Sequence, residues 1–445
     1  MERLMEVVIF LLLGRRTLRE TNPTLSLNNS SDCLKWPLKF EVAYGQVAKN
    51  RIMKAPMSEM LSTYNSENDT LSGLPTESLL NLYRIWSVGG SGIIVTGSIA
   101  VNENYLEKKG NLLISRNVDS PQRRHMFKML SATSGSESLI IAQLLHPGRN
   151  AVQLHPGTEA LDMNNISISG LKEIVEEHIY AARFCEDCGF DGIELNVALD
   201  FAIAQLVDAS TNNRTDDYGG GLLSRTKIIF DIIGGMRKKL SNNEKFIVGM
   251  KMHCGNYKTA YNESEFVEYL EKLNNIGLDY ITLAGGYLDP SVCSTYLTNE
   301  TSFPRKNFYC QMLKAVRLHL TNIRVFHVGG FRSADIMRTV VSNNFGDGIA
   351  MARALAAEPD LPMKILNGQT ISAKDNILER SEFFLSKQAA STQMWQFAEN
   401  RTVLDLSNSD HVKAFLVALE KHRSEHSDSE DFVDFVKFDI DSLPC

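Results

Sequence analysis

Residues 192–220 read GIELNVALDFAIAQLVDASTNNRTDDYGG, and this stretch decides the fold that we expect. It begins with a short apolar strand, Gly192–Asn196, whose last residue stands at the entrance to a loop. The polar run Asn213–Gly220 follows further along the chain. An apolar strand that leads into a polar loop is one unit of a pattern that recurs through most of the sequence.

Seven other short apolar runs resemble this strand, and most of them are separated by room for a helix. The eight runs are Arg51–Pro56, Gly92–Thr96, Leu139–Gln143, Gly192–Asn196, Phe246–Lys251, Tyr280–Ala284, Arg324–Val328 and Gly348–Met351. Amphipathic helices are predicted between them, for example over Leu171–Cys188, Thr226–Leu240 and Glu263–Asn275. Continuous apolar strands that alternate with helices indicate an α/β protein with a parallel sheet covered on both faces. Eight such units predict a TIM (β/α)8 barrel over about residues 36–370.

An N-terminal hairpin is expected before the barrel. Leu38–Val42 alternates apolar and polar residues, and a turn near Gly45 returns the chain over Gln46–Asn50, so the hairpin should close the bottom of the barrel. Residues 1–35 are interpreted as a leader without a membrane role. The apolar run Val7–Leu13 within them is shorter than the roughly 20 residues that span a bilayer.

A helical, partly disordered C-terminal extension is predicted over residues 371–445. Aromatic and aliphatic residues recur there with some helical spacing, at Phe384 and Trp395 and again at Phe415 and Leu419. Residues 425–431, EHSDSED, are interpreted as a solvated linker.

The composition is that of a globular protein, with 43% of the 445 residues hydrophobic and 22% charged. The formal net charge of -7 argues against a nucleic-acid-binding surface, which is usually basic. The seven cysteines are scattered and odd in number, so they indicate no disulfide framework, and we expect a cytoplasmic protein. Cys185 and Cys188 form a CxxC without a second pair, which favours buried small residues over a metal site.

A phosphate site is predicted where the last two strands end. In a TIM barrel the active site lies at the carboxyl ends of the strands, and the loops after strands seven and eight usually hold phosphate. Gly329 and Gly330 end the seventh run and let backbone N–H groups approach an anion closely. Arg353 follows the eighth and offers a fixed fork to phosphate oxygens. The alternative is a plain turn beside a surface arginine.

Gln143 and Lys251 end the third and fifth runs and are compatible with a flavin. The pyrimidine edge of a flavin alternates donors and acceptors, and one amide side chain can pair with both. A cation beside that edge stabilises the negative charge of a reduced ring. A capped strand end and a buried ion pair are the alternatives for these two residues.

Several motifs resemble one protein family in their order and spacing. The segments are KNRIMKAPMS (49–58), GGSGIIVTGSIAV (89–101), QLLHPGR (143–149), GFDGIEL (189–195), NNRTDDYGG (212–220), VGMK (248–251), VFHVGGFR (325–332) and DGIAMARALAAEPDLP (347–362). Together they resemble the old yellow enzyme family, in the branch called NADH:flavin oxidoreductase/NADH oxidase.

The resemblance implies one FMN at the barrel mouth, NAD(P)H as the hydride donor and a small-molecule electron acceptor. The implied cofactor-binding residues are Ala55, Pro56, Met57, Ser58, Gly97, Gln143, Lys251, Gly329, Gly330, Ala352 and Arg353. Ser58 stands where relatives often carry Cys or Thr, and Ala352 replaces a glycine beside the phosphate. The sequence contains no G-x-G-x-x-G fingerprint of a separate dinucleotide domain, which agrees with a nicotinamide that shares the flavin pocket.

The substrate wall departs from the family. The family pattern after strand four reads roughly His-x-x-His/Asn-Gly-Tyr, and the corresponding residues here are Asn196, Leu199, Asp200 and Phe201. Asn196 is the predicted catalytic residue, because its amide can still donate a hydrogen bond to a substrate oxygen. Leu199 cannot donate a hydrogen bond, and Phe201 has no proton to give to a substrate carbon.

Three residues are candidate replacements for the missing proton donor: Asp200, His253 and Tyr287. The alternative for each is an ordinary role as a loop, core or packed side chain. His146 is interpreted as structural.

The sequence thus predicts an FMN-dependent oxidoreductase that passes hydride from NAD(P)H to an enone, quinone or oxygen-type acceptor by a ping-pong cycle. A catalytically degenerate barrel that acts as a scaffold or sensor is the main alternative, motivated by Leu199, Phe201 and Ala352. A barrel of the dihydroorotate dehydrogenase or dihydrouridine synthase type is disfavoured by the NNRTDDYGG motif and the acidic net charge. The acceptor, the choice between NADH and NADPH and the oligomeric state stay open at this point.

Overall fold

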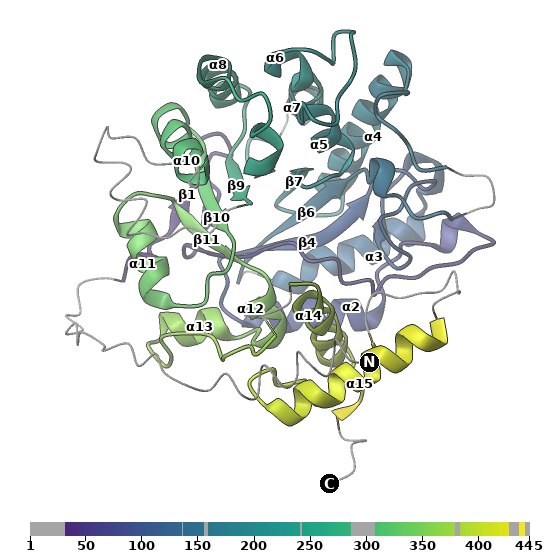
Figure 1. The fold of residues 1–445 in the computed structure, drawn as a ribbon, viewed down its shortest axis with the longest axis vertical. Coiled ribbons are helices and arrows are strands. Elements are labelled where there is room, and N and C mark those ends of the chain that lie inside the picture. Colours follow the sequence, from purple (N-terminus) through teal and green to yellow (C-terminus); the bar gives the residue numbers. More distant parts are fainter. Residues whose placement is uncertain are drawn as a thin grey trace.

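Eight parallel strands close into the barrel that the sequence predicts (Figure 1). The computed structural model describes residues 32–135, 137–154, 159–240, 243–285, 308–378, 383–426 and 436–440. The barrel strands are β3 (Ile52–Lys54), β4 (Ile93–Ala100), β6 (Leu139–Leu145), β7 (Gly192–Val197), β8 (Ile247–His253), β9 (Tyr280–Ala284), β10 (Arg324–Val328) and β11 (Gly348–Met351). The barrel closes because β3 pairs with both β11 and β4.

Four strands, β4, β6, β7 and β8, run beyond their predicted carboxyl ends. β4 reaches Ala100 because the short strand β5 (Leu112–Leu113) pairs with its last residues, and β6 follows it to Leu145. The register between β4 and β6 shifts between Val95 and Ser98. A bulge of this kind changes the direction in which the next side chain points. It places Ser98 opposite Gln143 at the carboxyl end of the barrel.

The N-terminal hairpin closes the opposite end of the barrel, as predicted. Its strands, β1 (Leu38–Lys39) and β2 (Val47–Ala48), are shorter than the sequence suggests. Phe40 packs with the inward-facing Tyr280, with the ring centroids 6.3 Å apart. The backbone N–H of Ala43 donates to Asp279 Oδ1 at 2.6 Å and fixes the turn to the start of β9.

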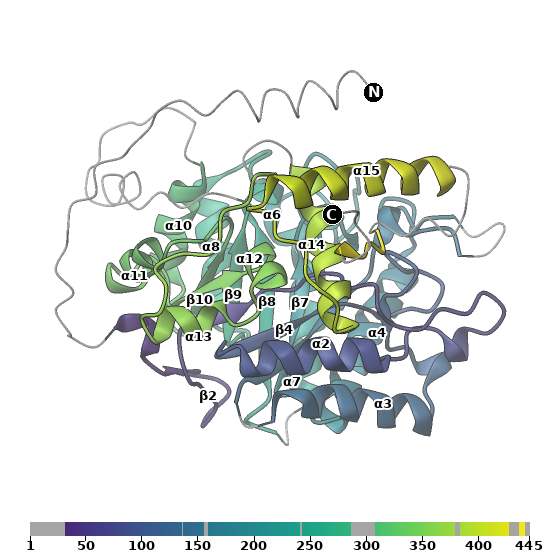
Figure 2. The same ribbon diagram turned by 90° about the horizontal axis from the view of Figure 1, so that it is seen from below.

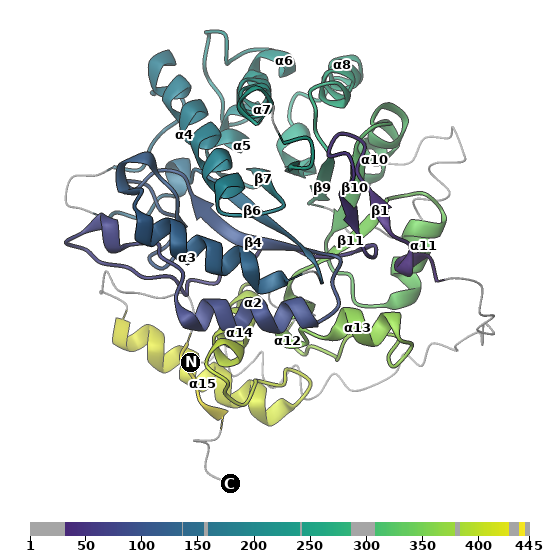
Figure 3. The ribbon, with the colours of Figure 1, turned by 180° about the vertical axis from the view of Figure 1, so that it is seen from behind.

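Helices cover the outside of the barrel (Figures 1 and 3). The longer ones are α2 (Glu77–Val88), α3 (Pro121–Ser131), α4 (Ile168–Asp187), α7 (Lys227–Lys239), α8 (Glu263–Asn274), α10 (Phe308–His319) and α11 (Ala334–Ser342). The shorter ones are α5 (Ala202–Val207), α6 (Leu222–Arg225), α12 (Arg353–Ala357) and α13 (Leu361–Leu366). The helices predicted over Leu171–Cys188, Thr226–Leu240 and Glu263–Asn275 correspond to α4, α7 and α8. Cys185 and Cys188, at the end of α4, are buried free thiols, as expected of packing residues.

The described residues of the C-terminal extension include two helices, α14 (Phe383–Ala398) and α15 (Ser409–His426) (Figure 2). α14 lies against α2 and α12, and α15 packs on its outer side through an apolar cluster that includes Ala389, Phe415 and Leu419. The helical part of the prediction is confirmed, whereas residues 427–431 of the predicted linker lie outside the described residues.

Buried polar side chains of α14 tie the extension together. Gln396 donates to Phe438 O and accepts from Leu404 N, both at 2.8 Å. Gln393 donates to Leu404 O at 2.7 Å. An amide that pairs with two backbone groups is costly to break, because each partner is then left buried and unpaired. α14 is therefore held on both sides, by the barrel and by the chain that follows it.

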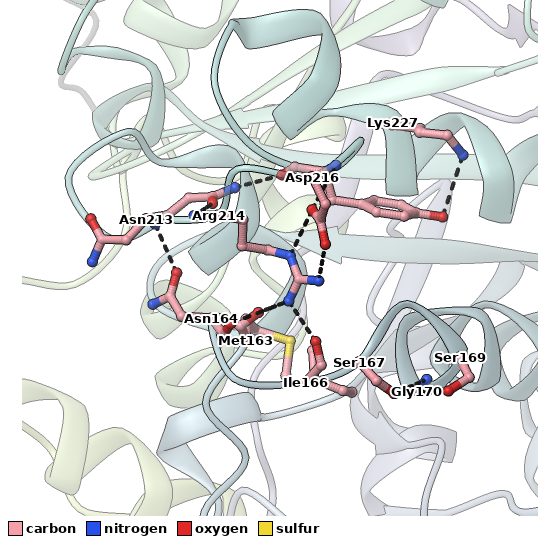
Figure 4. A network of polar contacts seen from close by, with 12 residues as sticks. Met163, Asn164, Ile166, Ser167, Ser169, Gly170, Asn213, Arg214, Asp216 and Lys227 are labelled. Carbon is pink, nitrogen blue, oxygen red and sulfur yellow. Dashed lines mark hydrogen bonds and ion pairs between the residues drawn. The ribbon is translucent and has the colours of Figure 1, made fainter.

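The polar run Asn213–Gly220 fixes the long loop after β7 to the chain that leads into α4 (Figure 4). The Arg214 guanidinium donates to the carbonyl oxygens of Met163 and Ile166, both at 2.7 Å, and pairs with Asp216. Only 5% of the Arg214 side chain is exposed. The motif thus stabilises the fold, and the cavity described below is lined by other residues.

Across the described part of the chain, none of the helices combines the length and the apolar character needed to cross a bilayer. The cytoplasmic location stays a prediction.

Candidate active site

A cavity of about 470 Å³ opens at the carboxyl ends of the barrel strands, where this fold places its active sites. Residues from the ends of β6, β7, β8 and β11 and from the loops after β3 and β10 form much of its wall. Sites that bind cofactors or small molecules usually enclose roughly 300–1,000 Å³. The barrel therefore offers a cofactor-sized cavity at the expected end.

Most of the predicted site residues line this cavity. They are Pro56, Met57, Ser58, Gln143, Asn196, Lys251, Gly329, Gly330, Ala352 and Arg353. The residues are distant in sequence, and they meet because parallel strands end at the same edge of the barrel.

Ala55 and Gly97 are the two predicted cofactor contacts that do not border the cavity. Ala55 is 1% exposed and packs inside the barrel. The backbone N–H of Gly97 donates to Glu59 Oε1 at 2.9 Å, and a Cβ atom at position 97 would lie 1.9 Å from Glu59 Oε2. Gly97 is thus needed for the close approach of the loop after β3, and its effect on the site is indirect.

An amide and a cation both belong to the polar part of the wall. Gln143 is 2% exposed, and its Nε2 donates to Glu194 Oε1 at 2.7 Å. Lys251 also lines the cavity. Burial lowers the pKa of Lys251, and the negative charges of Glu194 and Glu107 oppose this shift. The cavity therefore contains a fixed donor–acceptor pair and a positive charge that carboxylates support.

The predicted phosphate end of the cavity is built from a turn and an arginine. Gly329 and Gly330 follow β10 with φ angles of 149° and 66°, which residues with a side chain rarely adopt. Arg353 begins α12, and its Nη1 donates to Ser386 Oγ on α14 at 3.1 Å. The turn and the arginine border the same cavity, and α14 helps to hold the guanidinium there.

The wall after β7 is mostly apolar. Asn196 is 4% exposed, and its Nδ2 donates to Gln143 Oε1 at 3.3 Å. Leu199 has a φ of 58° and is 55% exposed, and both Leu199 and Phe201 border the cavity. Where the family pattern carries a second donor and a tyrosine, this chain presents two hydrocarbon side chains.

The candidate proton donors lie in different places. Asp200 does not border the cavity but pairs with Arg149 at the surface, with 2.7 Å between Nε and Oδ2, which speaks against a role as the acid. His253 does border the cavity, and burial together with the charge of Lys251 lowers its pKa. Its Nδ1 accepts from Gly255 N at 3.2 Å. Tyr287 lies outside the described residues.

His146 behaves as a structural residue, in agreement with its interpretation. It is 2% exposed and does not line the cavity, and its Nδ1 accepts from Gly148 N at 3.1 Å. Burial lowers the pKa of His146 to about 3.

One wall of the cavity comes from α14, which the motifs do not reveal. Its contributing residues are Lys387, Ala390, Ser391 and Met394. Their spacing of three and four residues puts them on one face of the helix. The sequence contains that spacing, but it does not show which part of the protein this face of the helix packs against. Ser98 and Glu107 also line the cavity but are not among the predicted site residues. Glu107 accepts a 2.8 Å hydrogen bond from Ser58 Oγ.

Comparisons with known proteins identify the family of this barrel. Residues 37–371 match the model of the NADH:flavin oxidoreductase / NADH oxidase family. The NADH-dependent flavin oxidoreductase nadA of Aspergillus parasiticus is 30% identical over 408 residues, which cover 86% of this chain and 90% of that protein. The NADH-dependent flavin oxidoreductase iliE of Hypocrea jecorina is 25% identical over 370 residues, 75% of this chain and 89% of that protein.

A solved structure shares the fold. The old yellow enzyme homologue from Zymomonas mobilis superposes with a TM-score of 0.60 at 18% identity, over 77% of this chain and 94% of that one. The predicted family is confirmed by the match over the barrel, and the chain belongs to the NADH:flavin oxidoreductase/NADH oxidase family, the old yellow enzyme family.

Proposed function

We propose that this protein is an FMN-dependent oxidoreductase that takes hydride from NAD(P)H and passes it to a small-molecule acceptor in a ping-pong cycle. The observation that carries the proposal is the cavity in which Gln143, Lys251, the Gly329–Gly330 turn and Arg353 meet. NADH is the favoured donor, because the two curated relatives named above are NADH-dependent.

The residues present fit FMN. The Gln143 amide can pair with the donors and acceptors of the pyrimidine edge, and Lys251 supplies a charge beside it. Asn196 Oδ1 is buried and has no hydrogen-bond partner among the described residues, as expected of a group that meets a bound molecule. When bound, FMN supplies a ring that accepts hydride at N5 and hands it to a second substrate.

Each of these side chains has a distinct task. Gln143 orients the ring, and Lys251 holds a positive charge where negative charge accumulates during hydride uptake. Arg353 and the backbone N–H groups of the Gly329–Gly330 turn hold the phosphate. Phe201 and Met394 add apolar surface that excludes water, which strengthens the electrostatic interactions inside the cavity.

The apolar wall restricts the acceptor. Loss of a donor to a developing oxyanion costs ~10²–10³ in rate, and loss of a positioned general acid costs ~10²–10⁴. With Leu199 and Phe201 in these positions, ordinary enones should react slowly. Quinones, oxygen and strongly activated alkenes need no positioned acid and are the proposed acceptors.

The alternative is a degenerate family member that serves as a scaffold or sensor. One preparation separates the two proposals: the purified full-length chain is examined by visible spectroscopy and then titrated with NADH without oxygen. The enzyme proposal predicts a flavin absorption band that bleaches on addition of NADH. A colourless protein that takes up no added FMN would overturn the enzyme proposal.

The substitution Phe201→Tyr tests the apolar wall. If the missing proton donor limits enone reduction, the new hydroxyl should raise turnover of cyclohexenone by roughly tenfold or more. Reduction of the flavin by NADH should be unchanged, which provides the internal control. Unchanged enone turnover would mean that the geometry of the wall has diverged as well as its acid.

A further inference from the structure

A fully buried carboxylate stands behind the predicted flavin contacts. Glu194 on β7 is 0% exposed and does not border the cavity. Its Oε1 accepts from Gln143 Nε2 at 2.7 Å, and its Oε2 accepts from Thr282 Oγ1 at 2.8 Å. Nothing in the sequence motifs assigns a role to this group.

Strand register brings these side chains together. Gln143 on β6 lies directly opposite Glu194 on β7, and Lys251 on β8 lies opposite Thr282 on β9. Asn196, two residues after Glu194 on the same face of its strand, lies opposite Lys251. The carboxylate thus joins two neighbouring rows of polar groups, Gln143–Glu194 and Asn196–Lys251–Thr282, which together cross four adjacent strands.

The carboxylate decides which way the Gln143 amide points. An ionised carboxylate can only accept hydrogen bonds, so it must face the NH₂ group of Gln143. The carbonyl oxygen then lies on the other side, where it accepts from Asn196 Nδ2 at 3.3 Å and lies 3.4 Å from Ser98 Oγ. A flipped amide would set its oxygen against the carboxylate and leave the NH₂ group facing another donor.

The orientation of the Gln143 amide also fixes the orientation of the Asn196 amide. Because Gln143 presents an oxygen, Asn196 must turn its NH₂ group towards it, and Asn196 Oδ1 is left without a partner in the described part of the chain. Burial raises the pKa of Glu194, while the Lys251 charge and the hydrogen bonds from Thr282 and Gln143 favour the ionised form.

We propose that Glu194 is a positioning residue that sets the donor and acceptor pattern of the active site by fixing the amides of Gln143 and Asn196. With Glu194 in place, Gln143 keeps a second N–H for the pyrimidine edge of FMN, while its oxygen accepts from Asn196 and Ser98. Asn196 keeps an oxygen acceptor, so a bound group that faces that atom must carry an N–H or O–H. The inference rests on the proposed function, because FMN is the group whose binding reports the orientation.

The test is a double-mutant cycle on the full-length chain, with the FMN dissociation constant measured by flavin fluorescence. Glu194→Gln keeps the shape but offers Gln143 an amide that pairs either way round, so we expect the dissociation constant to rise by roughly tenfold. Gln143→Leu should also weaken binding. In the Gln143→Leu background, Glu194→Gln should add almost nothing, because the two residues act as one unit. Additive effects would overturn the proposal.

Asp279→Asn is the matched control. Asp279 is another fully buried carboxylate of the barrel, 0% exposed, but it lies at the opposite end and pairs with Arg237 at 2.5 Å. Its substitution should lower the melting temperature and leave the FMN dissociation constant unchanged. A similar weakening of FMN binding would mean that Glu194→Gln acts through stability alone.

Thr282→Val provides a second route if Glu194→Gln does not fold. It keeps the carboxylate but removes one of the hydrogen bonds that fix it. FMN binding should weaken by a few fold, and only while Gln143 is present; a weakening that persists in the Gln143→Leu background would contradict the proposal. A wild-type chain that binds no FMN overturns the proposed function and this inference together, whereas additive variants of an FMN-binding chain overturn this inference alone.

Discussion

The two sides of the cavity have different origins. On the barrel side, Gln143 and Lys251 lie near the carboxyl ends of β6 and β8 and are fixed by the closed, hydrogen-bonded sheet, and Arg353 follows β11. On the other side, Lys387, Ser391 and Met394 come from α14, which reaches the cavity only by packing against α2 and α12. The barrel side carries the groups for redox chemistry, and the helix side sets the shape of the space next to them. Four predictions test this division, from the largest expected effect to the smallest.

The barrel side should lose stability in acid. His146, His178 and His327 are buried in the barrel, and burial lowers their pKa values to about 3, 4 and 4. The unfolded chain takes up these protons near pH 6.5, so the stabilisation is present above that pH and falls as the pH drops towards 4. Each histidine contributes about 1.4 kcal/mol per pH unit in this window. Urea unfolding between pH 7 and 5 should show a loss of stability, partly offset by Glu177, whose pKa burial raises to about 7.

His178→Phe provides the control for the acid prediction. It removes one buried imidazole outside the cavity, so the slope of unfolding free energy against pH should become shallower. An unchanged slope would mean that His178 does not contribute to the acid sensitivity.

Removal of the cation on the barrel side should impair the chemistry. Lys251→Met keeps the length of the side chain but removes the charge beside the predicted flavin edge. Anaerobic stopped-flow reduction by NADH should slow by ~10²–10³, the usual effect of a lost electrostatic contact to a developing charge. Lys251→Arg keeps the charge and should retain most of the rate. Equal losses in both variants would show that shape, and not charge, matters there.

Loosening of the helix side should affect stability more than chemistry. Gln396→Leu leaves Phe438 O and Leu404 N unpaired in the interior, at a cost of about 1–3 kcal/mol in unfolding free energy. Gln388, on the same helix, accepts a 2.7 Å hydrogen bond from Arg423 at the surface, and Gln388→Leu should cost less than about 0.5 kcal/mol. Denaturant unfolding checks both. If Gln396→Leu slowed the reduction of the flavin by NADH while the protein was still fully folded, α14 would have a direct part in the chemistry.

The smallest effect is expected at the mouth of the cavity. Lys387 is exposed and lines the cavity, so it can attract the phosphates of a nicotinamide dinucleotide. Lys387→Ala should raise the KM for NADH a few fold at low salt, with kcat unchanged, since exposed charges contribute about 0.2–1 kcal/mol. Lys413→Ala on α15 is the matched control and should change neither constant. A salt-independent effect would indicate a packing role for the Lys387 side chain.

Much of the barrel side could be predicted from the sequence because its signals are local. The apolar runs mark the strands, and parallel strands carry the residues that end them to one edge. Gln143, Asn196 and Lys251 were located in this way. Ala55 and Gly97 do not border the cavity, and their assignment as direct contacts stays a prediction; the sequence does not show that Glu59 takes the Gly97 N–H. The sequence could not exclude Asp200 as the acid, because the ion pair between Asp200 and Arg149 joins residues that are far apart in the sequence.

The sequence by itself determined the (β/α)8 barrel, the family and the strand-end residues, because periodicity and motif spacing act over short stretches of chain. The tertiary structure alone decided that α14 forms a wall of the cavity and that Glu194 controls the Gln143 amide. Both depend on contacts between segments far apart in the sequence: the packing of the last helices on the barrel, and the alignment of four neighbouring strands. Packing and register of this kind leave no fixed spacing in the chain, so only the folded molecule reveals them.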